Sequence, residues 1–420
     1  MNRSTAAPAT APPAGLGADF RSALRSRAAR LGALPLQWQL RAAYQRRAAR
    51  GPDPAARPEP VEPQVVERAE LLRSEALRVW RGKHAGSGWR VLFHRPPSGV
   101  GAVWFADLME CLEHAGITCA ALGWGETGFR EKWSAFGPNV FVAIDSVDAL
   151  RTLDLEWIRR YKSDHGCLRL FTPVPSWRFP REGLSAADRW RLALATAGWS
   201  ADAYFSMMAE EFFQEFFREW AAAGFRYLSL PHGCNPLKHY PASGTRDHDY
   251  VVVTSCNPER IRVTWRYLRE ILARYRGVWG GSGWGFGIGA VPPAELRMHY
   301  SRARIAPHPL VSYLVQHPLE VSERVFTAAA CGAFQITDRT PVTSRFFTDR
   351  ELVCVTGPRE FQAAFDHYVH HAEERTAIVL QGLQRVFASH TYFHRITALL
   401  DFVRQSAEPF PGTEPDTAPR

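Results

Sequence analysis

Residues 317–338 read HPLEVSERVFTAAACGAFQITD and change within this stretch from a helical to a strand pattern. Ser322 is a residue type that favours the position before a helix, and Glu323 places a negative charge where the helix dipole favours one. Gly332 is typical of a helix end, because glycine adopts the left-handed conformation at little cost. The apolar run 333–336 then predicts a buried strand. A helix that leads through a glycine into a buried strand is typical of α/β proteins.

The predicted helix carries a polar stripe. Glu320, Arg324, Thr327 and Cys331 are spaced four, three and four residues apart, which puts them on one helix face. A nucleotide diphosphate would suit this stripe, because arginine can clamp phosphate oxygens and hydroxyls can bond to ribose. The alternative is that Arg324 pairs with Glu320 and has no further role.

Strand and helix patterns alternate along the chain on both sides of this stretch. Buried strands are expected at 90–93, 117–122, 140–144 and 167–171, and then at 250–254, 277–280, 304–306, 334–337 and 352–355. Residues 204–222 are expected to form one amphipathic helix. Alternation of this kind implies right-handed crossovers and parallel sheets. We therefore predict an α/β protein with two Rossmann-like, doubly wound domains that face a cleft, with ligands beyond the carboxyl ends of the strands.

Composition suggests where these domains begin and end. We expect a disordered or helical, basic extension and linker over 1–63, a first domain over 64–245, a second domain over 246–389, a helix over 390–405 that packs back towards the first domain, and a disordered tail over 406–420.

Positive charge is concentrated at the N-terminus. The net charge is +9, but residues 1–66 alone hold ten Arg against four acidic residues, so the remaining chain is near neutral. A basic groove for nucleic acid is therefore not expected. The basic segment 20–50 also contains Phe20, Leu24, Leu31, Trp38 and Leu40, which predicts a basic amphipathic helix broken near Pro35. A weak membrane-surface contact, a solvated arm and an organelle transit peptide are the alternatives for it.

Cysteine usage points to a reducing compartment. The seven cysteines are scattered and form no C-x-x-C pair, which argues against a disulfide framework or a zinc ribbon and favours the cytoplasm. His367, His370 and His371 resemble metal ligands, but no acidic or cysteine partner stands at metal-ligand spacing. We expect a solvated face there, and neither a metal nor a resident cofactor.

The stretch from Arg324 to Asp338, RVFTAAACGAFQITD, resembles the CgeB-like (spore maturation protein-like) branch of the GT-B glycosyltransferases, whose pattern is R-x-F-E-A-x-A-C-G-x-F. Further similarities stand in the family's order, upstream at Leu230-Pro231-His232-Gly233 and Trp279-Gly280-Gly281, and downstream at Glu373-Glu374-Arg375 and His390-Thr391-Tyr392 with Arg395. Their order and spacing over about residues 200–404 make the resemblance more specific than any single motif. A dinucleotide oxidoreductase fits less well, because the G-x-G-x-x-G fingerprint is missing.

The resemblance implies transfer of a sugar from a nucleotide-diphosphate sugar to an unknown acceptor, without a metal. The family usually has an acid where Thr327 stands, and that acid is implied to hold hydroxyls of the donor. Glu320 or Glu323 could take its place. A catalytically inactive relative that binds nucleotide sugars, or serves as a scaffold, is the alternative.

The resemblance and the local patterns together give a set of candidate site residues. Arg324 would stabilise the leaving diphosphate, and His94, at the end of the first strand, could act as a general base. The residues expected to bind the donor are Ser255, Arg260, Trp284, Glu320, Glu323, Arg324, Thr327 and Gly332. A glycine-rich turn at a helix start, with Ser98, Gly99 and Gly101, is expected to contact the acceptor or the phosphates. The alternatives are a structural histidine, a solvated arginine and an ordinary turn.

Overall fold

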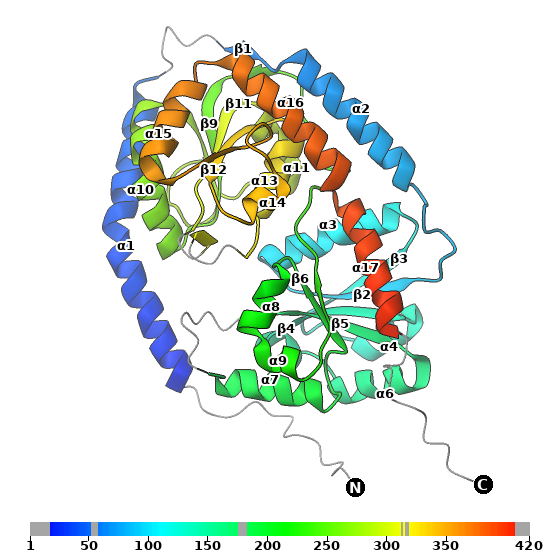
Figure 1. Cartoon of the computed structure of the whole chain (residues 1–420). Coiled ribbons are helices and arrows are strands. Elements are labelled where there is room, and N and C mark those ends of the chain that lie inside the picture. The colour runs from blue at the N-terminus through cyan, green and yellow to red at the C-terminus, as the bar shows by residue number, and fades with distance from the viewer. Residues whose placement is uncertain (1–16, 52–57, 175–182, 312–313, 316–318, 408–420) are drawn as a thin grey trace, which may run out of the picture. The chain divides into compact units, whose positions relative to one another are not determined.

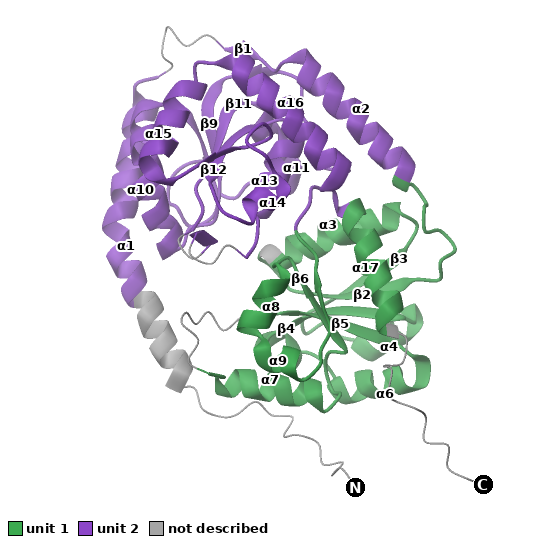
Figure 2. Ribbon diagram, in the orientation of Figure 1, with its two compact units in different colours: residues 1–14, 80–231, 393–420 green, residues 15–79, 232–392 purple. Residues whose placement is uncertain are grey.

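The computed structural model describes residues 17–51, 58–174, 183–311, 314–315 and 319–407. Within these ranges the chain forms two compact units (Figure 2). Residues 80–231 and 393–407 belong to the first unit, and residues 17–79 and 232–392 belong to the second. Much of the expected disordered N-terminal segment, and almost all of the expected tail, lie outside the described residues.

The first unit is built on a six-stranded sheet with the order β3-β2-β4-β5-β6-β7 (Figure 1). Every neighbouring pair in it is parallel. The strands are β2 (Arg90–Arg95), β3 (Thr118–Gly123), β4 (Val140–Asp145), β5 (Leu168–Pro173), β6 (Ala203–Ser206) and β7 (Tyr227–Ser229). All residues of β4 and β5 are buried, as expected for central strands covered on both faces.

The helices of the first unit connect these strands, apart from the last one, which follows all of them in the chain. They are α3 (Val100–His114), α4 (Phe129–Phe136), α5 (Val147–Arg151), α6 (Leu155–His165), α7 (Ala186–Thr196), α8 (Glu210–Phe216), α9 (Arg218–Ala222) and α17 (Tyr392–Ala407), whose residues from Phe393 onward belong to this unit. The single helix predicted for 204–222 is wrong. Tyr204 and Phe205 are buried in the parallel strand β6, and Phe217 separates α8 from α9. A bulky aromatic run fits a buried strand as well as a helix, and sheet pairing decides between them.

The second unit repeats the architecture with five parallel strands in the order β10-β9-β11-β12-β13. The strands are β9 (His248–Val253), β10 (Gly277–Gly280), β11 (Ala303–His308), β12 (Phe334–Asp338) and β13 (Val353–Val355). The helices are α10 (Pro258–Arg274), α11 (Pro293–Ser301), α13 (Glu323–Ala330), α14 (Thr343–Phe346), α15 (Gly357–Tyr368) and α16 (Ala372–Ser389). Two doubly wound parallel sheets confirm the predicted fold class.

The described N-terminal residues 17–51 and 58–79 are part of the second unit and do not form a separate arm. Helix α1 (Gly17–Ala49) lies alongside α10, and α2 (Pro63–Trp80) also belongs to this unit up to Val79 (Figures 1 and 2). Between them β1 (Glu59–Pro60) pairs antiparallel with β8 (Thr245–Arg246). Residues 64–79, expected in the first domain, therefore differ from that expectation. Apolar side chains of both helices find their partners in the second unit, which local sequence patterns do not reveal.

Helix α1 continues through Pro35, where a break was expected. Proline removes one backbone N–H from a helix and leaves the carbonyl four residues earlier without its usual donor. Pro35 and Leu31 are both exposed, so water can bond to that carbonyl. The opposite side of α1 is packed, since Ala33, Leu40 and Ala43 are buried in the core of the second unit. Among the described residues, no helix has both the length and the apolar character needed to cross a membrane.

An aromatic cluster under α1 fixes the glycine-rich loop that follows β10. The rings of Trp279, Trp284 and Phe286 all contact one another. Gln37 of α1 donates to the backbone oxygens of Gly283 and Trp284 at 3.1 and 2.7 Å. The indole of Trp284 donates to the carbonyl oxygen of Thr254 at 2.7 Å. The loop is therefore a buried support for the chain just after β9.

We predict that Trp284→Ala lowers the free energy of unfolding of the second unit by about 3–5 kcal/mol, because it leaves a large cavity and an unpaired carbonyl. Trp38→Ala is the matched control, since Trp38 is 66% exposed and Trp284 only 1%. The control variant should change stability by no more than about 0.5 kcal/mol. Urea denaturation followed by circular dichroism measures both, and equal effects would contradict the structural role of Trp284.

Candidate functional site

The strand order of the second sheet defines where a ligand site is expected. From β9 the chain passes to β10 on one side and then to β11 on the other side of β9. Open α/β sheets bind their ligands at such a switch point, beyond the carboxyl ends of the two diverging strands. The helices that follow parallel strands begin at this same edge, so the N-termini of α10 and α13 add partial positive charge there.

Two arginines, one in the first turn of each of these helices, extend to the switch point. Arg260, in the first turn of α10, donates from Nη1 to the oxygen of Pro309, which directly follows β11, at 3.1 Å. Arg324, in the first turn of α13, donates from Nη1 to the oxygen of Val253, the last residue of β9, at 2.9 Å. Both side chains are half-buried. Each arginine thus reaches from a helix start to the end of a neighbouring strand.

A histidine lies close enough to both arginines, and a glutamate close enough to Arg260, to be affected by their charges. His308, the last residue of β11, is buried, and burial together with the charges of Arg324 and Arg260 holds its pKa well below the ordinary value. Its Nε2 has no hydrogen-bond partner among the described residues. Glu320 is half-buried just before α13, and burial raises its pKa to about 7, against the opposing charge of Arg260. Near neutral pH the cluster is therefore positive overall and suits an anion.

A small pocket lies beside this cluster, between strands β9 and β11 and the helices that cover them. It is lined by Val253, Tyr300, Pro307, His308, Arg324 and Gln335, among others. Gln335 donates to the oxygen of Val325 at 3.0 Å, so its amide supports the first turns of α13. Both His308 and Arg324 thus line this pocket.

Asp338 holds the loop after β11 in place. It ends β12, where its Oδ2 accepts from the backbone N–H of Leu310 at 2.8 Å and its Oδ1 accepts from the hydroxyl of Tyr267 at 2.7 Å. The Asp that closes the family-like motif therefore positions the chain next to Pro309. His308, Pro309 and Tyr267 were missed by sequence reasoning. A polar residue at the end of a buried strand was the available signal for His308.

The predicted polar stripe is only partly realised. Glu320 precedes α13, which starts at Glu323 and ends at Ala330, so the stripe does not extend over one continuous helix face. Ser322 does stand at the N-cap, but it makes no side-chain capping bond. Thr327 is buried, Glu323 is half-buried and Ser255 is exposed after β9. The structure thus brings Ser255, Arg260, Glu320, Glu323 and Arg324 to the same edge of the sheet.

Two candidate donor residues lie elsewhere. Trp284 is enclosed in the aromatic cluster and would have to leave the core to stack on a base. Gly332 has φ of +69° and ends α13 as predicted, but it stands before the amino end of β12, at the opposite edge from the switch point. A Cβ at Gly332 would lie 3.0 Å from side-chain atoms of Pro241 and Val65. Both residues therefore serve packing in this structure.

In the first unit the switch point lies between β2 and β4. His94, on β2, is fully buried, and burial lowers its pKa to about 4. Its Nε2 lies 3.2 Å from the hydroxyl of Thr152, and its ring stacks on Trp124. His94 is therefore neutral and enclosed, which does not fit an accessible general base. His94 is near the end of β2, but its side chain faces the core and is therefore buried.

The loop after β2 remains accessible. Ser98 is exposed, and Gly99 is the N-cap of α3 with φ of 88° and open space around the position of a Cβ. A Cβ at Gly101 would lie 3.0 Å from the Ile144 side chain, so the glycine lets α3 approach β4. This turn at a helix start retains the geometry of an anion contact.

A buried ionic network lies at the carboxyl end of β4. Asp145 is its last residue, and Arg191 of α7 lies 3.6 Å from the Asp145 carboxylate and pairs with Asp188 at 2.5 Å. Burial raises the pKa of Asp145 although the charge of Arg191 opposes this. Sequence reasoning missed this group. Its signal was an acid directly after the apolar run 140–144.

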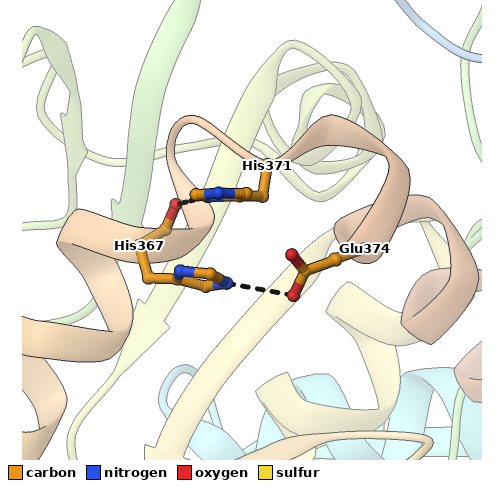
Figure 3. Close-up of side chains that lie close together, drawn as sticks. All are labelled: His367, His371 and Glu374. Atoms are coloured by element: carbon orange, nitrogen blue, oxygen red, sulfur yellow. Dashed lines mark hydrogen bonds and ion pairs between the residues drawn. The ribbon is translucent and has the colours of Figure 1, made fainter.

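The expectation that His367, His370 and His371 have no acidic partner is wrong for His367. Glu374, in the first turn of α16, lies beside it, with its Oε2 3.0 Å from Nε2 of His367 (Figure 3). His371 Nδ1 lies 2.6 Å from the backbone oxygen of His367, and the two rings stack with centroids 3.9 Å apart. All three side chains are exposed. An imidazole binds a metal in its own plane, so two stacked rings do not present one common coordination position.

Comparisons with known proteins support the fold. Residues 262–401 match the family described as "Glycosyl transferase-like", which is about a third of the chain. Sucrose-phosphate synthase from Thermosynechococcus elongatus aligns with a TM-score of 0.53 and 13% identity, over 76% of this chain and 98% of that one. No curated protein matches the sequence.

Two further solved structures align at TM-scores below 0.5. A glycosyltransferase from Rickettsia africae has a TM-score of 0.48 and 9% identity over 76% of this chain and 99% of its own. The Anabaena protein HepE, solved in complex with UDP and glucose, has a TM-score of 0.46 and 10% identity over 76% of this chain and 99% of its own. With the two doubly wound sheets and the first alignment, the conclusion is that this chain has the GT-B glycosyltransferase fold, with a glycosyl transferase-like segment at residues 262–401.

Proposed function

We propose that the protein is a metal-independent glycosyltransferase of the CgeB-like branch, which transfers a hexosyl or related sugar from a nucleotide-diphosphate sugar to an acceptor. The observation that carries the proposal is the meeting of Arg260 and Arg324 at the switch point of the second sheet. The glycosyl transferase-like match over residues 262–401 supports the same assignment for this half of the chain.

The chemistry follows from charge. When the bond between the sugar and the diphosphate breaks, negative charge develops on the leaving diphosphate, and fixed positive groups nearby lower that barrier. Arg260 and Arg324 would exchange their bonds to backbone oxygens for bonds to phosphate oxygens. The N-termini of α10 and α13 would add their partial charges. These groups would do the work that a divalent cation does in metal-dependent transferases.

The remaining donor contacts are proposed for groups at the same edge. Glu320 and Glu323 are half-buried and carry the acceptor oxygens that sugar and ribose hydroxyls need. They would compensate for Thr327, which stands in place of the family acid and is buried. Ser255, exposed after β9, could bond to a phosphate oxygen.

The acceptor is proposed to bind the first unit, at the accessible turn with Ser98 and Gly99. A cytoplasmic location is supported by the seven cysteines, all of which are free thiols in the structure.

A second candidate is a protein that binds nucleotide sugars without transferring them. Two observations favour it. Thr327 lacks the charge of the family acid, and His94 is enclosed and neutral, so it would not deprotonate an acceptor. Binding is common to both candidates, and turnover separates them.

We predict that Arg324→Ala and Arg260→Ala each weaken the binding of the matching donor at least tenfold, because a charge-assisted bond to phosphate contributes about 1.5–3 kcal/mol. Isothermal calorimetry with UDP-, GDP- and dTDP-glucose identifies the donor and measures the loss. Arg262→Ala is the matched control, because Arg262 is an exposed arginine of the same helix. Full-strength binding by the Arg324 variant would refute the proposed site.

Hydrolysis of the bound donor without acceptor, followed by nucleotide release, tests catalysis. We expect slow release by the wild type and none by Arg324→Ala. Tight binding with no release, also in the presence of candidate acceptors, would instead establish the non-catalytic binder.

We also predict that donor affinity falls as the pH rises through about 7, the pKa to which burial raises Glu320. Below this pH Glu320 is neutral and no longer opposes the attraction of Arg260 for the diphosphate. Above it the carboxylate repels the phosphates, so binding favours the protonated form. If binding raises the Glu320 pKa by one further unit, affinity falls about tenfold.

Glu320→Gln should bind donors with an affinity that no longer changes between pH 6 and 8. The control is Glu270→Gln, an exposed acid towards the C-terminal end of α10, which should keep the wild-type pH dependence. A donor-sugar diphosphate has no ionisation of its own in this range, so the slope reports on the protein. An unchanged slope in the Glu320 variant would exclude this residue as its source.

A further inference from the structure

Helix α1 presents a second apolar face that none of the described residues covers. Leu31, Leu34 and Trp38 are 67%, 36% and 66% exposed. Their spacing of three and four residues places them in one stripe along the helix. Most exposed apolar residues are isolated, and a continuous stripe with a tryptophan is instead typical of a binding surface.

The opposite face holds α1 firmly on the second unit. Ala33, Leu40 and Ala43 are buried there. Trp265 donates to the side chain of Gln39 at 2.8 Å, and Arg47 donates to the backbone oxygen of Arg274 at 2.9 Å. The outward stripe is therefore displayed on a helix that is already anchored, and its exposure does not come from a loose arm.

The surroundings of the stripe are strongly basic. Residues 17–50 contain eight Arg and one Asp, with neither Lys nor Glu. Arg30, Arg41 and Arg46 are exposed, and the helical period puts them at the flanks of the stripe. An apolar strip with tryptophan between rows of arginine is the pattern of helices that lie in the interface of an anionic membrane.

We propose that this face of α1, defined by Leu31, Leu34 and Trp38 with the flanking Arg30, Arg41 and Arg46, docks the protein on an anionic lipid surface. The apolar side chains enter the boundary between headgroups and acyl chains. The arginines bond to lipid phosphates, to which each basic residue near the surface is attracted.

Charge and composition separate this occupant from the other two that the face could take. A symmetric contact with a second copy would set the two rows of arginine against each other, which disfavours association. Nucleic acid would satisfy the arginines but leave the apolar stripe in water. An anionic lipid surface meets both requirements. The proposal does not depend on the proposed sugar transfer.

The test is co-sedimentation of the full chain with vesicles of phosphatidylcholine alone or with about 30% phosphatidylglycerol. We expect binding only to the anionic vesicles, and weaker binding in 0.5 M salt because salt screens the arginines. The double variant Leu31→Ser with Trp38→Ser should lose at least tenfold in partitioning, and Arg30→Gln with Arg41→Gln should lose most of the salt-dependent part. Leu71→Ser is the matched control, since Leu71 of α2 is 61% exposed but is flanked by the acidic Glu67 and Glu70.

Several outcomes would overturn the proposal. These are equal binding to neutral vesicles, absence of binding to anionic vesicles, and wild-type binding by the double variant. A dimer in light scattering that the double variant converts to a monomer would assign the face to a second copy. Unchanged thermal unfolding and nucleotide-sugar binding of the double variant establish that the variant is folded, and they separate failure of this proposal from failure of the proposed function.

Discussion

Parallel strands joined by right-handed crossovers impose the constraint on which the rest of this protein depends. Every connecting helix must begin at the edge of the sheet where the strands end, so helix N-termini, strand carboxyl ends and connecting loops gather along one edge. In the second unit the strand order switches sides at this edge, because β10 lies on one side of β9 and β11 on the other. The two arginines are brought together there although 64 positions of sequence separate Arg260 from Arg324.

The remainder of the second unit holds that edge in place. Trp284 bonds to the carbonyl of Thr254, and Gly281 allows the same stretch to approach so closely that a Cβ would lie 1.8 Å from the Thr254 oxygen. Asp338 fixes the loop after β11 through Leu310. Helix α1 packs along α10, whose first turn carries Arg260. Residues that bear no chemistry of their own thus determine where the two guanidinium groups lie.

Electrostatics at this edge is shaped by burial as much as by charge. The arginines stay charged because guanidinium does not lose its proton in proteins, whereas the histidine and the glutamate beside them change state when water is excluded. His308 is kept neutral and Glu320 is held near its midpoint at neutral pH. Burial likewise keeps His94 of the first unit neutral. The charge of a residue on this edge therefore depends on how deeply its side chain is buried, and not on its position along the edge alone.

Local physics in the sequence determined the elements: the apolar runs that became β4 and β12, the glycine that ends α13 and the arginine in the first turn of that helix. Backbone propensities and side-chain periodicity act over a few residues, so short stretches suffice to read them. Only the tertiary structure decided that Trp284 supports a loop, that His94 is enclosed, that α1 belongs to the second unit and that Arg260, His308 and Glu320 share one field. These outcomes depend on burial and on contacts between distant segments, because solvent exclusion and proximity in space are properties of the packed chain and of no single stretch of it.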